Sequence, residues 1–375
     1  MRDADAVALL ERLVALPSPP GGERAAADAL VAAMAATADR AYVDEAGNAV
    51  GEWGRGPVNV TFLGHLDTAP GWPPVRCEDG VLYGRGSVDA KGSLCAAVCA
   101  VARSRTAWPQ ALSVRVIGAV EEEAPSSRGA RHAMRAYPRP DHLVVCEPSG
   151  WDRYTVGYKG ALAVTLRGVT EARHGSRDEP SAAELVVDAF AAVRGWVAER
   201  NAGVEGIFDR LQLRLVRVSS RSDGLAERCV ARLGLRLPPS LPWRRAADAL
   251  RALPLPDGVS LAARHGLDAC LGDARSELAR AFRVAVREAG GSPSPVRKAG
   301  TSDWNVVARS WPVPTLAYGP GDSSLDHAPD ERLPVADYLR SIEVVSRALQ
   351  ELAAAGPRDR EPLVGDAAGS QSTST

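Results

Sequence analysis

The sequence has few of the features that mark secreted or membrane-bound proteins. Its 375 residues include six cysteines, and these form neither a Cys-x-x-Cys pair nor a regular framework. A chain of this length rarely needs disulfides, so we expect reduced thiols and a cytoplasmic protein. No stretch reaches the roughly 20 apolar residues of a membrane helix, and the acidic N-terminal residues do not resemble a signal peptide. The sequence therefore predicts a protein without a membrane partner.

An excess of charge of either sign is also missing. The formal net charge is −1 at pH 7, whereas proteins that bind nucleic acid or anionic membranes usually carry a clear positive excess. We therefore expect no nucleic-acid partner. The length exceeds what one modest hydrophobic core fills, which favours two domains.

The most informative stretch is an apolar run that ends in polar residues. Residues 58–63 have the composition of a buried strand, and Gly64-His65-Leu66-Asp67 follows them directly. Sheets of alternating strands and helices place their chemistry where strands end. His65 offers an imidazole, Asp89 offers a carboxylate, and Asp67 lies close enough in sequence to hold the imidazole in one tautomer. These residues predict half of a metal site.

Candidates for the remaining ligands follow later strands, since catalytic zinc needs at least three protein ligands. The candidates are Glu121-Glu122-Glu123 after residues 114–120, Glu147 after residues 143–146, and His327 in the loop 318–329. A lone loop histidine is usually solvated, and a run of glutamates is usually a solvated face. Three like charges at the end of a buried strand are costly unless a cation neutralises them, however. The joint pattern therefore favours metal.

The order of elements predicts the fold class and the domains. Strands and helices alternate up to about residue 154, which predicts an α/β fold with a mostly parallel sheet flanked by helices. From 155 to 267 apolar and polar residues alternate as in antiparallel strands with one solvated face, so we predict an inserted α+β domain. The catalytic domain then comprises residues 1–154 and 268–355. The tail 356–375 has almost no apolar residues and is predicted to be disordered.

Five segments in this order resemble the co-catalytic di-zinc peptidase and deacylase family, which includes succinyl-diaminopimelate desuccinylase, acetylornithine deacetylase and the aminoacylases. These segments contain His65, Asp89, the three glutamates, Glu147 and His327. The resemblance implies two Zn²⁺ ions bridged by Asp89, with Co²⁺ as a substitute. His65 and Glu147 would complete one zinc site, and Glu123 and His327 the other. Two such ions can share one water, lower its pKa and polarise an amide carbonyl.

The resemblance also assigns roles to residues that are not zinc ligands. Glu122 would be the general base, because relatives usually carry Asp-Glu-Glu here with the base in the middle. Glu121 as base with Glu122 as ligand remains an alternative. Asp67 would orient the imidazole of His65. His174 would reach across a homodimer interface formed by the inserted domain and donate a hydrogen bond to the oxyanion of the partner's substrate.

Four further residues are candidates for the substrate pocket. Lys159, in Gly157-Tyr158-Lys159-Gly160, lies where relatives carry a basic residue near the domain junction. Thr301, Ser302 and Asp303 belong to a Gly-Thr-Ser-Asp loop that resembles the corresponding loop of the desuccinylases. An ordinary helix cap by Ser302 or Asp303 explains this loop equally well, and the two interpretations are compatible.

The resemblance implies a zinc-dependent hydrolase of linear amide bonds. Segments 118–127, 157–160 and 318–327 are most similar to hydrolases that release lysine or ornithine from a small amino-group carrier protein, in lysine and arginine biosynthesis. One alternative is a deacylase for small molecules such as acetylornithine or succinyl-diaminopimelate, and another is a metallo-carboxypeptidase. A non-catalytic metal-binding relative is a further alternative, against which the retained Glu122 argues.

Overall fold

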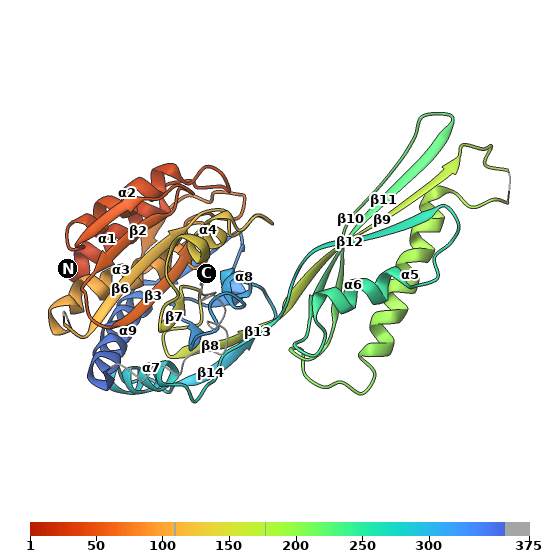
Figure 1. Ribbon diagram of the computed structural model, residues 1–375. Helices are drawn as coiled ribbons and strands as arrows, with labels where there is room; N and C mark the ends of the chain where they lie inside the picture. Colours follow the sequence, from red (N-terminus) through yellow and green to blue (C-terminus); the bar gives the residue numbers. More distant parts are fainter. Residues whose placement is uncertain (109, 177, 357–375) are drawn as a thin grey trace, which may run out of the picture.

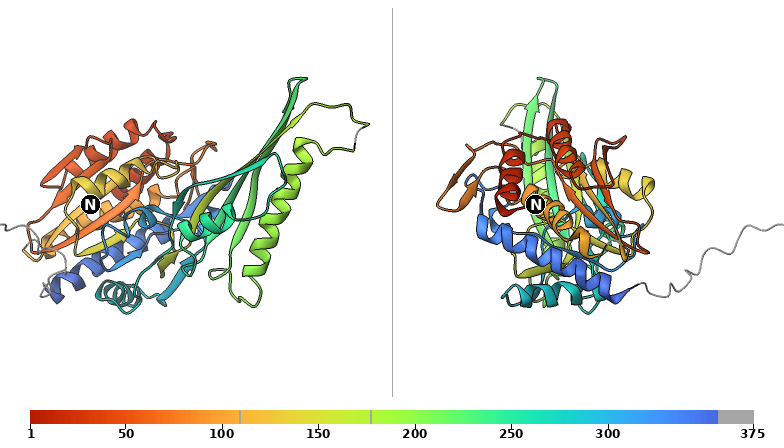
Figure 2. Two further views of the ribbon diagram at one scale, coloured as in Figure 1. Left: turned by 45° about the vertical axis from the view of Figure 1, so that its right-hand side comes forward. Right: turned by 90° about the vertical axis from the view of Figure 1, so that its left-hand side faces the viewer.

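The computed structural model describes residues 1–108, 110–176 and 178–356, which form two lobes (Figure 1). The larger lobe contains both ends of the chain as described, and the smaller lobe extends from one side of it (Figure 2). Among these residues no helix combines the length and the apolar character that crossing a membrane requires. The tail predicted to be disordered lies outside the described residues from 357 onward.

The larger lobe is built on a nine-stranded sheet. Its spatial order is β1 (Arg40–Val43), β2 (Ala49–Trp53), β6 (Leu112–Ala119), β3 (Val58–His65), β7 (His142–Val145), β15 (Thr315–Ala317), β8 (Arg153–Tyr158) and β13 (Cys270–Leu271), and β14 (Ser294–Lys298) pairs with β8. Strand β3 pairs in parallel with β6 and β7, and β7 with β15, whereas β1, β2 and β13 pair antiparallel. This mainly parallel sheet confirms the predicted α/β class.

Helices cover both faces of the large sheet. One face packs against α1 (Asp3–Val14), α2 (Arg24–Ala35), α3 (Lys91–Ser104), α7 (Glu277–Glu288) and α9 (Val335–Ala355), and the other against α4 (Arg128–Ala136) and α8 (Asp303–Val307). Strand β3 contributes Val60 and Phe62 to the first core and Leu63 to the second. Because both faces are covered, β3 is a continuous apolar run and not an alternating one.

A small sheet and two short helices complete the larger lobe. The small sheet contains β16 (Arg332–Pro334), β5 (Val81–Tyr83) and β4 (Arg76–Glu78). The short helices are η1 (Arg105–Ala107) and η2 (Ser323–Leu325). The pairing of β16 with β5 brings the chain that follows His327 next to the chain that precedes Asp89.

The smaller lobe is a four-stranded antiparallel sheet with two helices. Its spatial order is β10 (Gln212–Ser222), β11 (Ala226–Leu237), β9 (Gly160–Glu171) and β12 (Val259–Leu267), and its helices are α5 (Ala182–Arg200) and α6 (Trp243–Arg251). Alternate residues of β9 and β11 are buried against these helices, as the sequence pattern predicts. Ser181 caps α5 by accepting a hydrogen bond from the backbone of Glu184.

The chain crosses between the lobes twice, at residues 158–160 and 267–270. Strand β8 pairs within the large sheet as far as Tyr158, so the sequence-based boundary at 155 lies a few residues early. The side chain of Asn305 donates hydrogen bonds to the backbone oxygens of Lys159 (3.0 Å) and Asp268 (2.9 Å), one on each crossing. We propose residues 160–267 as the inserted domain.

Candidate metal centre

Carboxylates and imidazoles meet where the central parallel strands end. His65 is the last residue of β3, Glu122 and Glu123 follow β6, and Glu147 follows β7. Because these strands are parallel neighbours, their carboxyl ends lie at one edge of the sheet. Asp89 directly precedes Ala90, the N-cap residue of α3, where the helix dipole favours an ionised carboxylate.

Two groups of potential ligands share Asp89. In the first, Nε2 of His65 lies 3.1 Å from Oδ1 of Asp89 and 3.8 Å from Oε1 of Glu147. In the second, Nε2 of His327 lies 2.9 Å from Oδ2 of Asp89 and 2.7 Å from Oε1 of Glu123. All five predicted ligands therefore converge, and Asp89 directs one oxygen toward each imidazole.

The donor set and its electrostatics fit divalent cations. Burial opposes the charge of His65, but hydrogen bonds to Asp67 and Asp89 raise the pKa of His65 well above its usual range. Hydrogen bonds to Asp89 and Glu123 raise the pKa of His327 to about 10. Burial and the charge of Asp89 raise the pKa of Glu147 to about 8. A positive charge would stabilise the ionised form of these clustered carboxylates. A divalent ion bound by the imidazole nitrogens and carboxylate oxygens would supply that charge.

Asp67 forms hydrogen bonds with both His65 and the backbone of the glutamate segment 122–123. The backbone oxygen of Asp67 lies 2.8 Å from Nδ1 of His65, whereas its carboxylate is 3.6 Å from that atom. The carboxylate instead accepts hydrogen bonds from the backbone nitrogens of Glu122 (3.0 Å) and Glu123 (2.8 Å). Asp67 therefore orients the imidazole mainly through its backbone and uses its side chain to position the glutamate loop.

The geometry distinguishes the three consecutive glutamates. Glu121 pairs with Arg128 at 2.8 Å and accepts a hydrogen bond from Ser126, outside the ligand groups. Glu123 contacts His327. Glu122 is bonded to neither histidine, and burial together with the charges of Asp303 and Glu147 raises its pKa well above the usual range. The alternative with Glu121 as base gains no support from these contacts.

The sequence analysis missed a buried ion pair between Arg85 and Glu331. It connects the loop that contains His327 with the loop that contains Asp89. Nη1 of Arg85 lies 2.7 Å from Oε2 of Glu331, and Arg85 also donates to the backbone oxygen of His327. Oε1 of Glu331 accepts hydrogen bonds from the backbone nitrogens of Val88 and Asp89. His327 has a left-handed φ of 62°, a region that non-glycine residues adopt only when their surroundings hold them there. In the sequence, the signal for this pair was limited to two acids, Asp330 and Glu331, close behind His327.

The loop 300–303 borders the centre and also caps a helix. The hydroxyl of Ser302 accepts a hydrogen bond from the backbone of Trp304 at the start of α8, so the cap interpretation describes this residue. Thr301 accepts a hydrogen bond of 2.8 Å from Arg236 of β11. Asp303 is 2% exposed and neither carboxylate oxygen has a hydrogen-bond partner among the described residues. Burial raises the pKa of Asp303 to about 7, and its charge acts on Glu122.

Two candidate residues lie away from the five ligands. Lys159 is fully buried at the lobe junction, where its ammonium bonds to the backbone oxygens of Ile207 and Arg210 and to the side chain of Gln212. These three acceptors use all its donors, so a substrate contact of Lys159 has no support in this geometry. His174 bonds to Ser176 in the segment between β9 and α5, at the far end of the smaller lobe (Figure 1).

Lys298 is a further cation that sequence reasoning did not single out. Its ammonium donates to the backbone oxygen of Pro148, next to Glu147. Burial lowers the pKa of Lys298, while the charges of Asp326 and Glu147 act in the opposite direction. No motif marks this lysine, because only the pairing of β14 with β8 brings it to the acidic groups.

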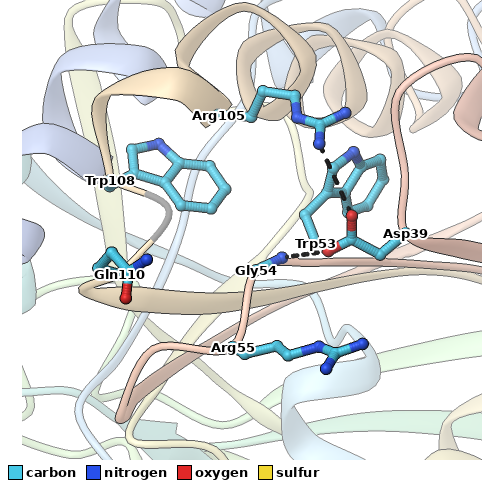
Figure 3. A pocket seen from close by; sticks show the side chains of 7 residues that line it. All are labelled: Asp39, Trp53, Gly54, Arg55, Arg105, Trp108 and Gln110. Carbon is cyan, nitrogen blue, oxygen red and sulfur yellow. Dashed lines mark hydrogen bonds and ion pairs between the residues drawn. The ribbon is translucent and has the colours of Figure 1, made fainter.

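A cavity of about 560 Å³ lies at the opposite end of the large sheet, between the end of β2 and the start of β6 (Figure 3). It is lined by Asp39, Trp53, Gly54, Arg55, Arg105, Trp108 and Gln110. Asp39 is already used, since it pairs with Arg105 at 3.6 Å and accepts a hydrogen bond from the backbone of Gly54. This cavity shares no residue with the ligand groups.

Comparison with known proteins gives consistent results. A protein-family model described as "Peptidase family M20/M25/M40" matches residues 61–351 of this chain. The LysW-lysine hydrolase of Deinococcus radiodurans is 48% identical over 358 residues, which are 92% of this chain and 96% of that protein. A putative LysW-lysine/LysW-ornithine hydrolase of Thermococcus kodakarensis is 36% identical, over 95% of this chain and 94% of that protein.

Solved structures support the fold alone, because their sequence identities are low. The M20 family metallo-carboxypeptidase Sso-CP2 from Sulfolobus solfataricus superposes with a TM-score of 0.77 at 16% identity, covering 93% of this chain and 99% of that one. Human carnosine dipeptidase 1 has a TM-score of 0.71 at 16% identity, over 94% and 97% of the two chains. Both the mixed α/β architecture and its inserted unit therefore recur in known proteins.

Proposed function

Because this chain belongs to the M20/M25/M40 peptidase family, whose members hydrolyse amide bonds with the help of metal ions, we propose that it releases lysine from the carrier protein LysW in lysine biosynthesis. The observation that carries this proposal is the 48% identity to a LysW-lysine hydrolase over 92% of the chain. Ornithine on the same carrier, an intermediate stage of arginine biosynthesis, is a second substrate suggested by the archaeal relatives. The reaction would take place in the cytoplasm.

We propose two Zn²⁺ ions as the resident metals, held by the two groups that share Asp89. His65, Asp89 and Glu147 would hold one ion, and Asp89, Glu123 and His327 the other. Bound there, zinc ions would polarise the amide carbonyl and make water acidic enough to react near neutral pH. Co²⁺ prefers the same nitrogen and oxygen ligands and is expected to substitute.

The chain's own groups then handle the proton and the substrate. The carboxylate of Glu122 accepts the proton of the attacking water and passes it to the nitrogen of the leaving amino acid. Burial is the main cause that raises the pKa of Glu122, and a raised pKa favours uptake of the proton by this carboxylate. Thr301 and Asp303, which border the centre, are proposed to contact the substrate.

A homodimer through the smaller lobe is the second part of the proposal. Strand β10 lies at the edge of its sheet, and Leu215, Val216 and Val218 on it are exposed. An exposed edge strand with apolar side chains is suited to pairing with a second copy. His174 belongs to the segment between β9 and α5, which lies at the end of the smaller lobe away from the larger lobe (Figure 1), so its proposed role as oxyanion donor would be exercised at the partner subunit's centre.

A substrate screen tests the reaction. The zinc-loaded protein is incubated with LysW-linked lysine, LysW-linked ornithine, N-acetylornithine and N-succinyl-diaminopimelate, and free amine is measured. We expect cleavage of LysW-lysine and two equivalents of zinc by elemental analysis. Cleavage of the small acyl compounds alone would instead identify a small-molecule deacylase, and metal binding without any cleavage would identify a non-catalytic relative.

A further inference from the structure

One face of the smaller lobe's sheet carries a concentration of positive charge. Strands β9 and β11 bury alternate residues against α5 and α6, and the residues between them point to the opposite, helix-free face. The strand register places eight arginines there: Arg167, Arg214, Arg217, Arg221, Arg228, Arg232, Arg236 and Arg264. We call this surface the arginine face.

The arginine face is basic along its whole length. Five successive rows of cross-strand neighbours, from Arg236 to Arg228 on β11, each contain at least one of its arginines. The eight steps from Arg236 to Arg228, at about 3.4 Å each, span roughly 27 Å. Within these rows no strand places an acidic side chain on this face, and the first, Glu171, follows beyond the last row. Between the arginines lie mostly small side chains such as Ala163, Thr165 and Ala262.

The positions of some of these arginines lower the stability of the sheet. Arg217 lies directly opposite Arg232, and Arg221 directly opposite Arg228. Like charges in directly opposite positions destabilise a strand pair. The large sheet shows the usual solution, because Arg115 there lies opposite Glu52 and pairs with it at 2.9 Å.

Most of these arginines are not neutralised within the chain. Arg228 pairs with Asp223 at 2.5 Å, and Arg236 donates to Thr301. The other six, Arg167, Arg214, Arg217, Arg221, Arg232 and Arg264, are exposed and form no ion pair or hydrogen bond with another described residue. Since the whole chain has a net charge of −1, the positive field is local and marks one surface.

The arginine face leads to the metal centre. Arg236, at its inner end, donates to Thr301 of the loop beside the centre, and the charge of Glu122 acts on Arg236. Helix α5 lies on the side of the sheet that is turned away from the larger lobe (Figure 1). An extended acidic chain bound along the face would therefore have one end at the reacting amide.

We infer that the arginine face binds an acidic protein segment, namely the carrier part of the substrate. This inference rests on the proposed function, in which the amino acid arrives attached to a protein. Single-stranded nucleic acid fits less well, because none of the strand residues on this face is aromatic and bases would have nothing to stack on. Opposite charges on the two partners would guide association and set the register of the carrier on the enzyme.

The test removes one like-charged pair and compares it with a matched pair on the opposite side of the same lobe. Arg217→Gln/Arg232→Gln is compared with Arg244→Gln/Arg245→Gln on α6, where both arginines are exposed. Two quantities are measured in the full-length protein: KM for LysW-linked lysine, and Kd for a fluorescent peptide of ten glutamates. We expect both constants to rise about tenfold in the first variant and to stay within twofold of wild type in the second.

Three further observations make the outcome decisive. The wild-type KM should rise with salt more steeply than that of Arg217→Gln/Arg232→Gln, because salt screens exposed charges. The melting temperature of this variant should not fall, because the change removes a repulsion between two arginines. If binding weakens while the melting temperature is unchanged, unfolding is excluded as the cause. Equal constants in wild type and both variants, or equal losses in both variants, would overturn the inference.

The same assays separate this inference from the proposed function. If the wild type binds the glutamate peptide through these arginines but does not cleave LysW-lysine, the proposed substrate is wrong and an acidic partner of another kind remains. If single-stranded DNA or phosphatidylserine vesicles displace the peptide and bind more tightly through Arg217 and Arg232, the assignment of a protein partner is overturned.

Discussion

Asp89 has the most demanding position in the structure. It is nearly buried and approaches two imidazoles at once, with Oδ1 3.1 Å from His65 and Oδ2 2.9 Å from His327. Burial alone would favour its protonated form, but its bonds to both histidines lower the pKa of Asp89. A carboxylate that stays ionised in such a place can bridge two cations, and no other residue of the two groups is shared.

Replacing Glu122 separates catalysis from metal binding. Glu122→Gln keeps the size of the side chain but cannot accept a proton, so we expect hydrolysis to fall roughly 10²- to 10⁴-fold with zinc content unchanged. The control is Glu121→Gln, which alters the glutamate that pairs with Arg128 and should retain most activity. Amide hydrolysis under saturating substrate and elemental analysis provide the two readouts. Equal activity of Glu122→Gln and wild type would contradict the proposed mechanism.

The buried Lys159 predicts that the stability of the protein depends on pH. Its side chain is fully buried, and burial lowers its pKa to about 8 from an ordinary value of 10.5. Between these two values the unfolded chain binds more protons than the folded one, so the free energy of unfolding rises with pH. Below about 8 both states are charged and this dependence vanishes.

The measurement for Lys159 is urea unfolding at pH 7.5 and at pH 10. The unfolding free energy of wild type minus that of Lys159→Met should be larger at pH 10, because other titrating groups cancel in the difference. A difference that stays flat or decreases would show that the buried amine keeps its proton throughout.

At the residue scale, the sequence predicted those side chains that follow a recognisable strand. His65, Glu123 and Glu147 end buried apolar runs, and in the structure they meet at one sheet edge. The functions of these residues stay predictions until metal binding is measured. Glu331 and Lys298 were missed because their importance comes from contacts with chain segments far away in sequence, which no local pattern encodes.

At the scale of elements, two loops are held in one position by a buried ion pair. Glu331 accepts backbone hydrogen bonds from the loop before α3, and Arg85 donates to the loop around His327. Arg85 is 6% exposed, so a missing partner would leave a buried positive charge without compensation. The ion pair thus holds the backbone at His327 and Asp89, two of the candidate ligands, although neither Arg85 nor Glu331 belongs to the ligand groups.

We expect Glu331→Gln to lower both stability and metal affinity. Breaking a buried ion pair from one side costs about 3–5 kcal/mol, and losing support for metal ligands lowers affinity roughly 10- to 100-fold. Chemical denaturation and competitive zinc titration measure the two effects. Glu343→Gln, which removes an exposed partner of Arg347, is the control and should change stability by less than about 0.5 kcal/mol. Similar small effects of both changes would argue against the supporting role.

Element boundaries show where sequence patterns stop being informative. The change of sequence pattern at about residue 155 marks the passage between the lobes only approximately, because the chain leaves the large sheet after Tyr158 and enters the small one at Gly160. Lys159 marks this transition, because its ammonium is bound by the segment 207–212 of the smaller lobe. A lysine bound by backbone oxygens cannot be recognised from its neighbours in sequence.

At the scale of the whole molecule, the proposed dimer predicts a complementation between two defective chains. His174→Ala removes the proposed oxyanion donor, which typically costs about 10²- to 10³-fold in rate, and Glu122→Gln removes the base. In a heterodimer of these chains, one centre would combine its own Glu122 with the partner subunit's His174. We therefore expect about half the wild-type activity from purified heterodimers, with both homodimers nearly inactive.

Differently tagged chains allow the heterodimer to be isolated, and a wild-type heterodimer purified in the same way is the reference. An inactive heterodimer would mean that His174 serves its own chain or takes no part in the reaction. Sedimentation of the wild type establishes that two chains associate.

The molecule's charge distribution was the property least accessible from the sequence. A net charge of −1 argued against nucleic acid and anionic membranes as partners, yet the four strands of the smaller lobe's sheet place eight arginines on one surface. Alternation within a strand is visible in the sequence, whereas the register that lines up Arg217 with Arg232 arises only on folding.

The two crossings between the lobes lie next to each other. Tyr158 pairs with Cys270, and the amide of Asn305 bonds to the chain on both crossings. During evolution the gene segment that encodes the smaller lobe can be exchanged, lengthened or shortened without moving the two points at which this lobe joins the larger one. Substrate preference can thus diverge through changes in the smaller lobe, while the five proposed metal ligands, which all lie in the larger lobe, keep their places.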